Sequence, residues 1–190
     1  AYMTAGLGMN PISTPAVNQS IKASTPTHCF YYEDQGHKFF AIRFSDRPAW
    51  VYDLKTGLWH ERSTGVNHGP WEVIATTKAF GRWYAGTSSG SIREMRRVNV
   101  DVGNPLKRTA VSRSLYLDGG QFSVSELEFL ARIGESDIGR DGEVIARFSD
   151  DGGRTWSLED RRSLGDIGDR TVYSVFRALG RYRDFTAEFS

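Results

Sequence analysis

The chain has 190 residues, enough for one domain with a hydrophobic core or for two small ones. Its 24 Lys and Arg residues nearly balance 23 Asp and Glu residues, so the formal charge of +1 gives no reason to expect nucleic acid or an anionic membrane as the main partner. Aromatic residues make up 13% of the chain, and 20 glycines accompany 6 prolines. This composition favours a turn-rich β protein over a helical one.

Cys29 is the one cysteine, which excludes an intrachain disulfide and a thiolate zinc site built by a single chain. It lies in a predicted strand, where we expect a buried, unreactive thiol. No apolar run approaches the ~20 residues of a membrane-spanning helix, and no basic segment followed by an apolar one marks a secretion signal. The sequence begins at Ala1 without an initiator Met, which suggests trimming or a fragment of a longer chain.

Residues 1–27 are expected to form an N-terminal loop followed by one short helix. Glycines and prolines among small residues predict a loop over residues 1–15. Thr14 then suits an N-cap and Pro15 the first helical position, while Val17 and Ile21 would share one face.

From residue 28 onward, short strands alternate with turns. The first predicted sheet, over about 28–63, has strands at His28–Glu33, Lys38–Phe44, Trp50–Asp53 and Leu58–Arg62. The second, over about 71–97, has strands at Trp71–Thr76, Ala79–Gly86 and Ser91–Arg96, with a turn at Thr77–Lys78. Both contain a Gly-led turn, a basic residue and two aromatics, a weak repeat typical of propeller blades.

The third predicted blade covers about 106–190. Periodicity alone cannot assign Glu126–Ile133 to helix or strand, but the alternation before it and the Gly-rich loop after it favour strand. The expected fold is therefore all-β, with β-propeller-like antiparallel meander sheets forming a partial propeller of three to four blades over residues 28–190.

The clearest turn motif follows the predicted strand that ends at Phe148. It reads Ser-x-Asp-x-Gly-x-Thr-Trp and comprises Ser149, Asp151, Gly153, Thr155 and Trp156. Asp and Ser side chains bond turn amides, Gly supplies a positive φ, and the indole is expected to return to the core. The motif resembles the Asp-box, a hairpin of β-propeller and related proteins that occurs in enzymes and non-enzymes alike.

Catalytic, cofactor and metal sites are not expected. The four histidines are scattered without metal-ligand spacing, no Gly-x-Ser-x-Gly elbow occurs, and the Gly-rich runs lack a Gly-Lys-Ser/Thr motif. The Asp-box suggests a sialidase, but the chain is too short to array that chemistry on separate blades. We therefore expect a protein that is not an enzyme and that uses no cofactor.

Arginines are frequent near the C-terminus but are matched by acids, so charged pairs on a sheet or at a subunit interface fit better than a DNA site. A contact with DNA, where made, is expected to be non-specific. Arg181, Tyr182 and Arg183, at a predicted tight turn, form a candidate for an interface anchor.

Several motifs in order make the chain similar to a known family. They are Ile12–Val17, Gly36–His37, Trp50–Asp53, Thr56–Arg62, the Asp-box, Arg161–Gly168 and Arg177–Asp184. This series resembles the packaged-DNA stabilisation proteins, the tail accessory factors of short-tailed bacteriophages, over residues 12–189. The chain looks like the later blades of such a protein.

The resemblance implies a structural virion protein of the phage neck or tail, made in the host cytoplasm. It would join the portal to the tail, help to retain packaged DNA and assemble as a homo-oligomeric ring with the portal protein and other tail proteins. The alternative is a carbohydrate- or receptor-binding propeller fragment of a tail structure. In that case Trp50, Trp59, Trp71 and Trp83 would be candidates for stacking on sugars.

Overall fold

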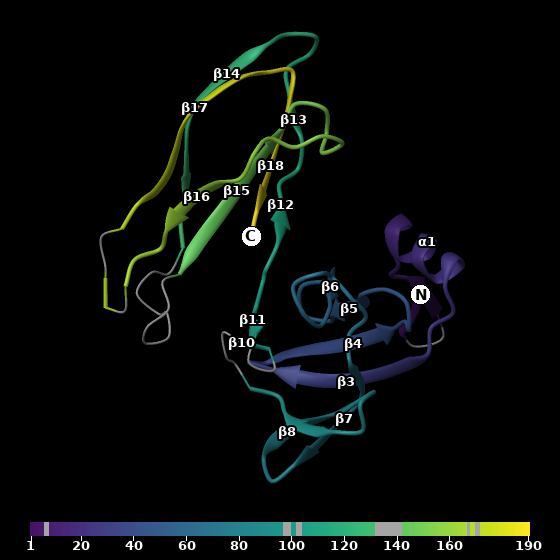
Figure 1. The fold of residues 1–190 in the computed structure, drawn as a ribbon. Coiled ribbons are helices and arrows are strands. Elements are labelled where there is room, and N and C mark those ends of the chain that lie inside the picture. The colour runs from purple at the N-terminus through teal and green to yellow at the C-terminus, as the bar shows by residue number, and fades with distance from the viewer. Residues whose placement is uncertain (6–7, 97–99, 102–103, 132–141, 167, 170–171) are drawn as a thin grey trace. The chain divides into compact units, whose positions relative to one another are not determined.

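The structure, a computed structural model, describes residues 1–190 except 6–7, 97–99, 102–103, 132–141, 167 and 170–171. The described chain forms two compact units, Ala1–Leu106 and Lys107–Ser190. Antiparallel sheets dominate both units, and α1 is the one helix among the described residues (Figure 1). The chain is thus mostly β with one short helix, as predicted.

The first unit begins with a hairpin and the predicted helix. Thr14 caps α1 (Pro15–Ala23), since its side chain accepts a hydrogen bond from the N–H of Val17 at 3.4 Å, and Val17 is fully buried. Strands β1 (Tyr2–Ala5) and β2 (Gly8–Pro11) pair upstream of the helix. The prediction of a loop over residues 1–15 is therefore wrong where β1 and β2 pair. The two strands bury few side chains, so the sequence shows no hydrophobic pattern from which they could be predicted.

A four-stranded meander follows, in the predicted order. Its strands are β3 (His28–Asp34), β4 (His37–Arg43), β5 (Ala49–Asp53) and β6 (Leu58–Arg62). Gln35 and Gly36 form the first turn with φ of 48° and 76°, which a two-residue hairpin of this kind requires. Cys29 lies in β3 but is exposed, so the expected burial of its thiol is wrong.

The second sheet has three strands, as predicted, but a different turn. Its strands are β7 (Val73–Ala79), β8 (Arg82–Thr87) and β9 (Ile92–Glu94). The first turn lies at Phe80–Gly81 rather than at Thr77–Lys78, with φ of 51° and 74°. Short strands β10 (Val100–Asp101) and β11 (Asn104–Pro105) pair at the end of the unit.

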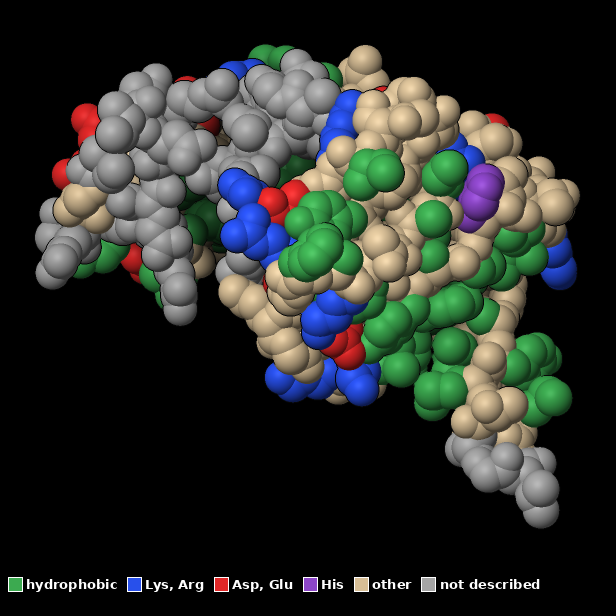
Figure 2. Space-filling view, turned by 90° about the horizontal axis from the view of Figure 1, so that it is seen from below, with side chains coloured by type: hydrophobic (Ala, Val, Ile, Leu, Met, Phe, Trp, Pro, Cys, Tyr) green, Lys and Arg blue, Asp and Glu red, His purple; other side chains and the backbone are tan. Residues whose placement is uncertain are grey.

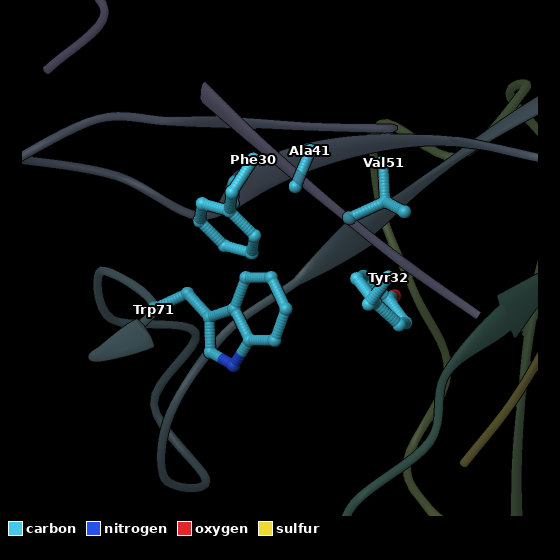
Figure 3. Packing of buried hydrophobic residues seen from close by; sticks show 6 residues of the cluster. Phe30, Tyr32, Ala41, Val51 and Trp71 are labelled. Atoms are coloured by element: carbon cyan, nitrogen blue, oxygen red, sulfur yellow. The ribbon is translucent and has the colours of Figure 1, made fainter. Parts of the chain in front are cut away.

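Aromatic residues join the two sheets of the first unit. The core cluster contains Phe30, Tyr32, Ala41, Ala49, Val51 and Trp71. Figure 3 shows the Trp71 indole beside the Phe30 ring, and their centroids are 5.4 Å apart. The Thr76 hydroxyl donates to the Tyr31 carbonyl at 2.5 Å, so β7 lies beside β3. That these sheets are propeller blades stays a prediction, as does a single propeller-type domain over 28–190.

The described residues of the second unit form two sheets whose strand order is not consecutive along the chain. One sheet has the order β12-β18-β15-β16, with β13 also paired to β18, and the other is β14-β17. Their bounds are Ala110–Val111 (β12), Leu115–Tyr116 (β13), Phe122–Phe129 (β14), Glu143–Ser149 (β15), Asp160–Ser163 (β16), Ser174–Tyr182 (β17) and Asp184–Phe189 (β18). The meander expected over 106–190 is therefore wrong, because β18 inserts between β12 and β15.

These two sheets pack face to face around phenylalanines. Buried residues of β15, β17 and β18 form one cluster, and apolar residues of β14 pack against it. Phe148 and Phe176, from different sheets, have ring centroids 6.0 Å apart, and Phe129 and Phe189 have theirs 5.0 Å apart. The unit is thus a two-layer β structure with its core between the sheets.

Strand β14 confirms the preference for strand over helix at residues 126–129 and explains the ambiguity. Its partly buried residues are Phe122, Val124, Leu127 and Phe129, so the alternation breaks between Val124 and Leu127. The pairing with β17 shifts register at this point, between Val124 and Glu126. An irregularity of this kind lets both halves of a strand turn their apolar side chains to the same core.

Candidate functional site

The turn between β15 and β16 is organised by the Asp151 carboxylate. Its Oδ1 accepts hydrogen bonds from the N–H groups of Arg154 and Thr155, both at 2.9 Å, and from Ser149 Oγ at 2.7 Å. Its Oδ2 accepts from the Thr155 hydroxyl at 2.7 Å. The bonds from Thr155, followed by those from Ser149 and Arg154, lower the pKa of Asp151 well below its ordinary value.

The other predicted residues of the motif complete the same turn. Ser149 Oγ accepts from the Gly153 N–H at 2.9 Å, and Gly153 has a φ of 88°. A Cβ on Gly153 would meet Trp156 at 3.2 Å, so the indole covers this glycine. Trp156 is half-buried beneath the Arg147 guanidinium, 5.5 Å from its ring, and lies outside the core cluster. The amide bonds expected of Asp and Ser are confirmed, whereas the return of Trp156 to the core is wrong.

We expect Asp151→Asn to lower the Tm of the second unit by about 4–8 °C at neutral pH, since it removes the charged acceptor of several turn hydrogen bonds. The folded pKa of Asp151 is depressed, so its contribution is complete above the ordinary pKa near ~4 and is lost as pH falls toward the folded value. The Tm difference between wild type and variant should therefore narrow below about pH 4 in calorimetric scans.

Asp150→Asn is the matched control, because Asp150 is the exposed carboxyl next in sequence. An equal effect of both substitutions, or a Tm difference that does not change with pH, would contradict the role given to Asp151.

The segment Arg181–Arg183 is not the tight turn that the sequence predicts. Arg181 and Tyr182 belong to β17, and Arg183 is the one residue between β17 and β18, where the chain passes from one sheet to the other. Tyr182 is half-buried, packs edge-on to Phe185 at 4.8 Å and donates its hydroxyl to the Leu179 carbonyl at 2.6 Å. Only the two arginines are exposed, which leaves them as the part of this candidate available to a partner.

The tryptophans named for sugar stacking have internal partners. Trp50 Nε1 donates to Ser20 Oγ at 2.9 Å and Trp59 Nε1 to the Ile12 carbonyl at 2.7 Å, which ties the N-terminal segment to the first sheet. Trp71 is in the core, and half-buried Trp83 packs edge-on to Tyr31. These indoles hold the first unit together.

Sequence reasoning missed a polar pocket in the first unit, although it noted the residues of its hairpin turn. The pocket has a volume of about 290 Å³ and is lined by Asp34, Gln35, His37, Phe39, Asp53 and Arg62. His37 Nδ1 lies 2.7 Å from Asp53 Oδ2, and Phe39 stacks on His37 with centroids 5.9 Å apart. The signal in the sequence was that His37 begins one strand and Asp53 ends the next, which antiparallel pairing brings together.

Asp53 is ionised and held by its neighbours. Burial raises its pKa, but hydrogen bonds from His37, the Lys55 N–H and the Thr56 hydroxyl more than offset this and lower the pKa to about 2. Across the pocket, the Arg62 guanidinium lies over the Tyr32 ring at 5.5 Å and the Phe39 ring at 5.9 Å. The pocket therefore combines a fixed carboxylate, a guanidinium and an aromatic wall.

We expect Asp53→Asn to make the first unit less sensitive to acid. Because the folded pKa is lowered to about 2, the carboxylate contributes fully above the ordinary pKa near ~4 and loses this contribution as pH falls toward about 2. Urea unfolding at several pH values should show wild-type stability falling more steeply over that range than the variant's. Glu61→Gln, an exposed carboxyl on the same sheet, is the control and should leave the wild-type slope unchanged.

The described residues contain no group of three or more His, Cys, Asp or Glu side chains placed to hold a metal ion. They also contain no helix with the length and hydrophobicity needed to span a bilayer. On the face drawn in Figure 2, Lys and Arg side chains are interspersed with acidic and hydrophobic ones among the residues shown in colour.

Comparison with known proteins places the second unit in a viral context. Residues 107–187 match the model of a family described as "Bacteriophage P22 Gp10, beta-sandwich". The two-layer arrangement of the second unit agrees with this description. Among curated proteins, none matches the chain. The family match covers less than half of the chain. It supports the interpretation that the chain is a structural protein of a phage virion.

Proposed function

We propose that the chain is a structural component of the phage neck or tail, where it joins the portal to the tail and helps to retain packaged DNA. The observation that carries this proposal is the match of residues 107–187 to the P22 Gp10 family. The resemblance of motifs over residues 12–189 to tail accessory factors points in the same direction. The proposed site of action is the virion neck or tail, after synthesis in the host cytoplasm.

The proposed role requires binding surfaces rather than chemistry. In the Asp-box turn, both oxygens of the Asp151 carboxylate accept hydrogen bonds from the turn itself, which suits a structural group better than a catalytic one. We therefore propose a protein that is not an enzyme and needs no cofactor. Its partners would be further copies in a ring, the portal protein and other tail proteins, with only non-specific contacts to DNA. A propeller arrangement of the sheets over residues 28–97 is part of this proposal.

The test is assembly with purified portal rings from a short-tailed phage. Electron microscopy should show additional density bound to the rings, and sedimentation velocity should show the chain moving with them. An unrelated β protein of similar size is the control. A chain that remains monomeric and leaves portal rings bare in both measurements would refute the proposal.

Carbohydrate or receptor binding is the second candidate, and the His37–Asp53 pocket favours it. Its lining offers Gln35 and Arg62 for hydrogen bonds to hydroxyl groups, beside the Phe39 ring. A glycan array with the full chain is the test. Binding that Gln35→Ala weakens would support this function, and an array without hits would remove it.

A further inference from the structure

The N-terminal hairpin of the first unit is exposed and uncharged. Every side chain of β1 and β2 that the structure describes is exposed, among them Tyr2 at 70% and Met9 at 73%. The register pairs Tyr2 with Pro11 and Thr4 with Met9, so these four residues share one face of the hairpin, which we name the arm face. The sequence has no charged side chain before Lys22. Because an isolated two-stranded hairpin is at best marginally stable in water, contact with a further surface would stabilise this one.

The base of the hairpin is held by the rest of the unit. Trp59 Nε1, from β6, donates to the Ile12 carbonyl at 2.7 Å, and the Ile12 N–H donates to the Ala1 carbonyl at 3.0 Å. Val17, in the helix that follows, is fully buried. The hairpin is therefore an exposed arm on a fixed base, which reduces the conformational entropy that it loses when it docks.

A small groove lies on the sheet of β7, β8 and β9. Its volume is about 210 Å³. Its lining residues are Ala75, Thr76, Thr77, Tyr84, Gly86 and Ile92, none of which is charged. We name it the Gly86 groove. Sites for small molecules usually measure about 300–1,000 Å³, so this groove suits one or two side chains of a protein better than a whole ligand.

Gly86 lies at the centre of the groove without a local reason to be glycine. It pairs with Ala75 on one side and with Ile92 on the other. Its φ is not in the positive region, and a Cβ would meet only the Ala75 carbonyl oxygen, at 4.0 Å. The nearby register shift lies in β7, between Val73 and Ala75, and does not require a glycine in β8. A glycine inside a strand weakens it and often marks the close approach of another chain, so Gly86 indicates a partner at this groove.

The charge nearest to the groove is already paired within the sheet. Glu94 is opposite Tyr84 in the register and so shares the face of the groove. Its carboxylate is bound by Arg82 at 3.2 Å and by Arg96 at 2.7 Å. A charged segment would have to compete with these ion pairs, whereas the uncharged arm face would not.

We infer that the arm face of one copy docks in the Gly86 groove of a second copy. Tyr2 and Met9 would bury apolar surface against Tyr84 and Ile92, and the copy that receives this arm offers its own arm to the next one. A head-to-tail contact of this kind closes into a ring where its rotation allows. The inference deepens the proposed function, because it rests on the assembly of several copies and names the surfaces that join them.

A second copy accounts for both surfaces better than other occupants do. Each chain has one arm and one groove, both uncharged, so copies match one to one. Within its own copy the arm does not fill the groove, since none of the described residues of β1 and β2 lines it. An apolar surface such as a membrane would cover the arm face but would leave the groove open.

Sedimentation velocity of the full chain over a range of concentrations tests the contact. The wild type should self-associate, and Met9→Asp and Gly86→Val should each raise the dissociation constant at least about tenfold. Met3→Asp is the matched control, because pairing with Asn10 places Met3 on the opposite face of the hairpin, and it should associate as the wild type does. Thermal melts should show Gly86→Val to be at least as stable as the wild type, since valine favours strands.

Disulfide crosslinking identifies the two surfaces. In a Cys29→Ser background, Met9→Cys protein mixed with Ile92→Cys protein should form a linked dimer under mild oxidation, and peptide mapping should find residue 9 joined to residue 92. Met3→Cys protein mixed with Ile92→Cys protein is the control and should crosslink at least about tenfold more slowly.

Four results would overturn the inference. They are a wild type that stays monomeric, a Gly86→Val variant that associates as the wild type does, equal effects of Met3→Asp and Met9→Asp, or equal crosslinking of residues 3 and 9 to residue 92. A monomeric chain that still binds portal rings would overturn this inference and keep the proposed function, so the two failures are distinguishable.

Discussion

Replacing Phe176 with alanine is expected to lower the free energy of unfolding of the second unit by about 3–5 kcal/mol. Phe176 is fully buried, and its ring lies 6.0 Å from that of Phe148 and 6.2 Å from that of Phe189. The Arg162 guanidinium covers it at 5.1 Å. The variant therefore loses the contacts that the Phe176 ring makes with the other sheet and leaves a cavity that β-sheet backbones cannot easily close.

Urea unfolding followed by NMR measures this effect in the second unit alone, because Trp156 is its one tryptophan and its indole N–H signal reports that unit. Tyr173→Ala is the control, since Tyr173 is 72% exposed and lies just before the same strand. We expect Tyr173→Ala to change the free energy of unfolding by less than about 0.5 kcal/mol. Equal losses for the two variants would mean that the sheets do not pack through Phe176.

Trp71→Ala should destabilise the first unit by about 3–5 kcal/mol. Trp71 is 8% exposed and lies between the two sheets, 5.4 Å from the Phe30 ring and 6.2 Å from the Tyr32 ring. Its carbonyl accepts a hydrogen bond from buried Arg43 at 2.8 Å, which the variant retains. The loss therefore measures indole packing rather than the backbone contact.

The indole N–H signals of Trp50, Trp59 and Trp83 report unfolding of the first unit in the same urea series. Phe80→Ala is the matched control, because Phe80 is an aromatic residue of a hairpin turn in the same unit and is 96% exposed. Its effect should stay within about 0.5 kcal/mol. If Trp71→Ala were as mild as this control, the joining of the two sheets by Trp71 would be refuted.

Local features could be predicted where one side chain determines the conformation of the backbone next to it. Thr14 and Pro15 mark the start of α1, Gly36 marks a hairpin, and Asp151 binds the amides of its own turn, all within a few residues. The strands of residues 28–62 pair in sequence order, so their meander also followed from local signals. The turn at Phe80–Gly81 was predicted at the wrong residues. The strand before it continues through polar residues, so the sequence contains no local signal for where that strand ends.

The candidate sites likewise differ in whether their contacts are local in sequence and therefore predictable. The hydrogen bonds of Asp151 are local and could be predicted, whereas the pocket of His37 and Asp53 depends on the register of two hairpins. The Arg181–Arg183 segment reads as a turn from its Gly180 and charged residues. It is instead the passage between two sheets, since β17 before it pairs with β14, and residues 186–189 of β18 after it pair with β15.

By itself, the sequence determined the mostly β class, the one short helix, the meander of residues 28–62 and the Asp151 turn, because each depends on composition or on contacts between near neighbours. Only the tertiary structure decided that the described residues of 107–190 form two packed sheets and that β18 inserts between β12 and β15. Pairing between strands far apart in sequence is selected by the burial of a common core, here that of Phe148, Phe176 and Phe185, and no local pattern encodes it.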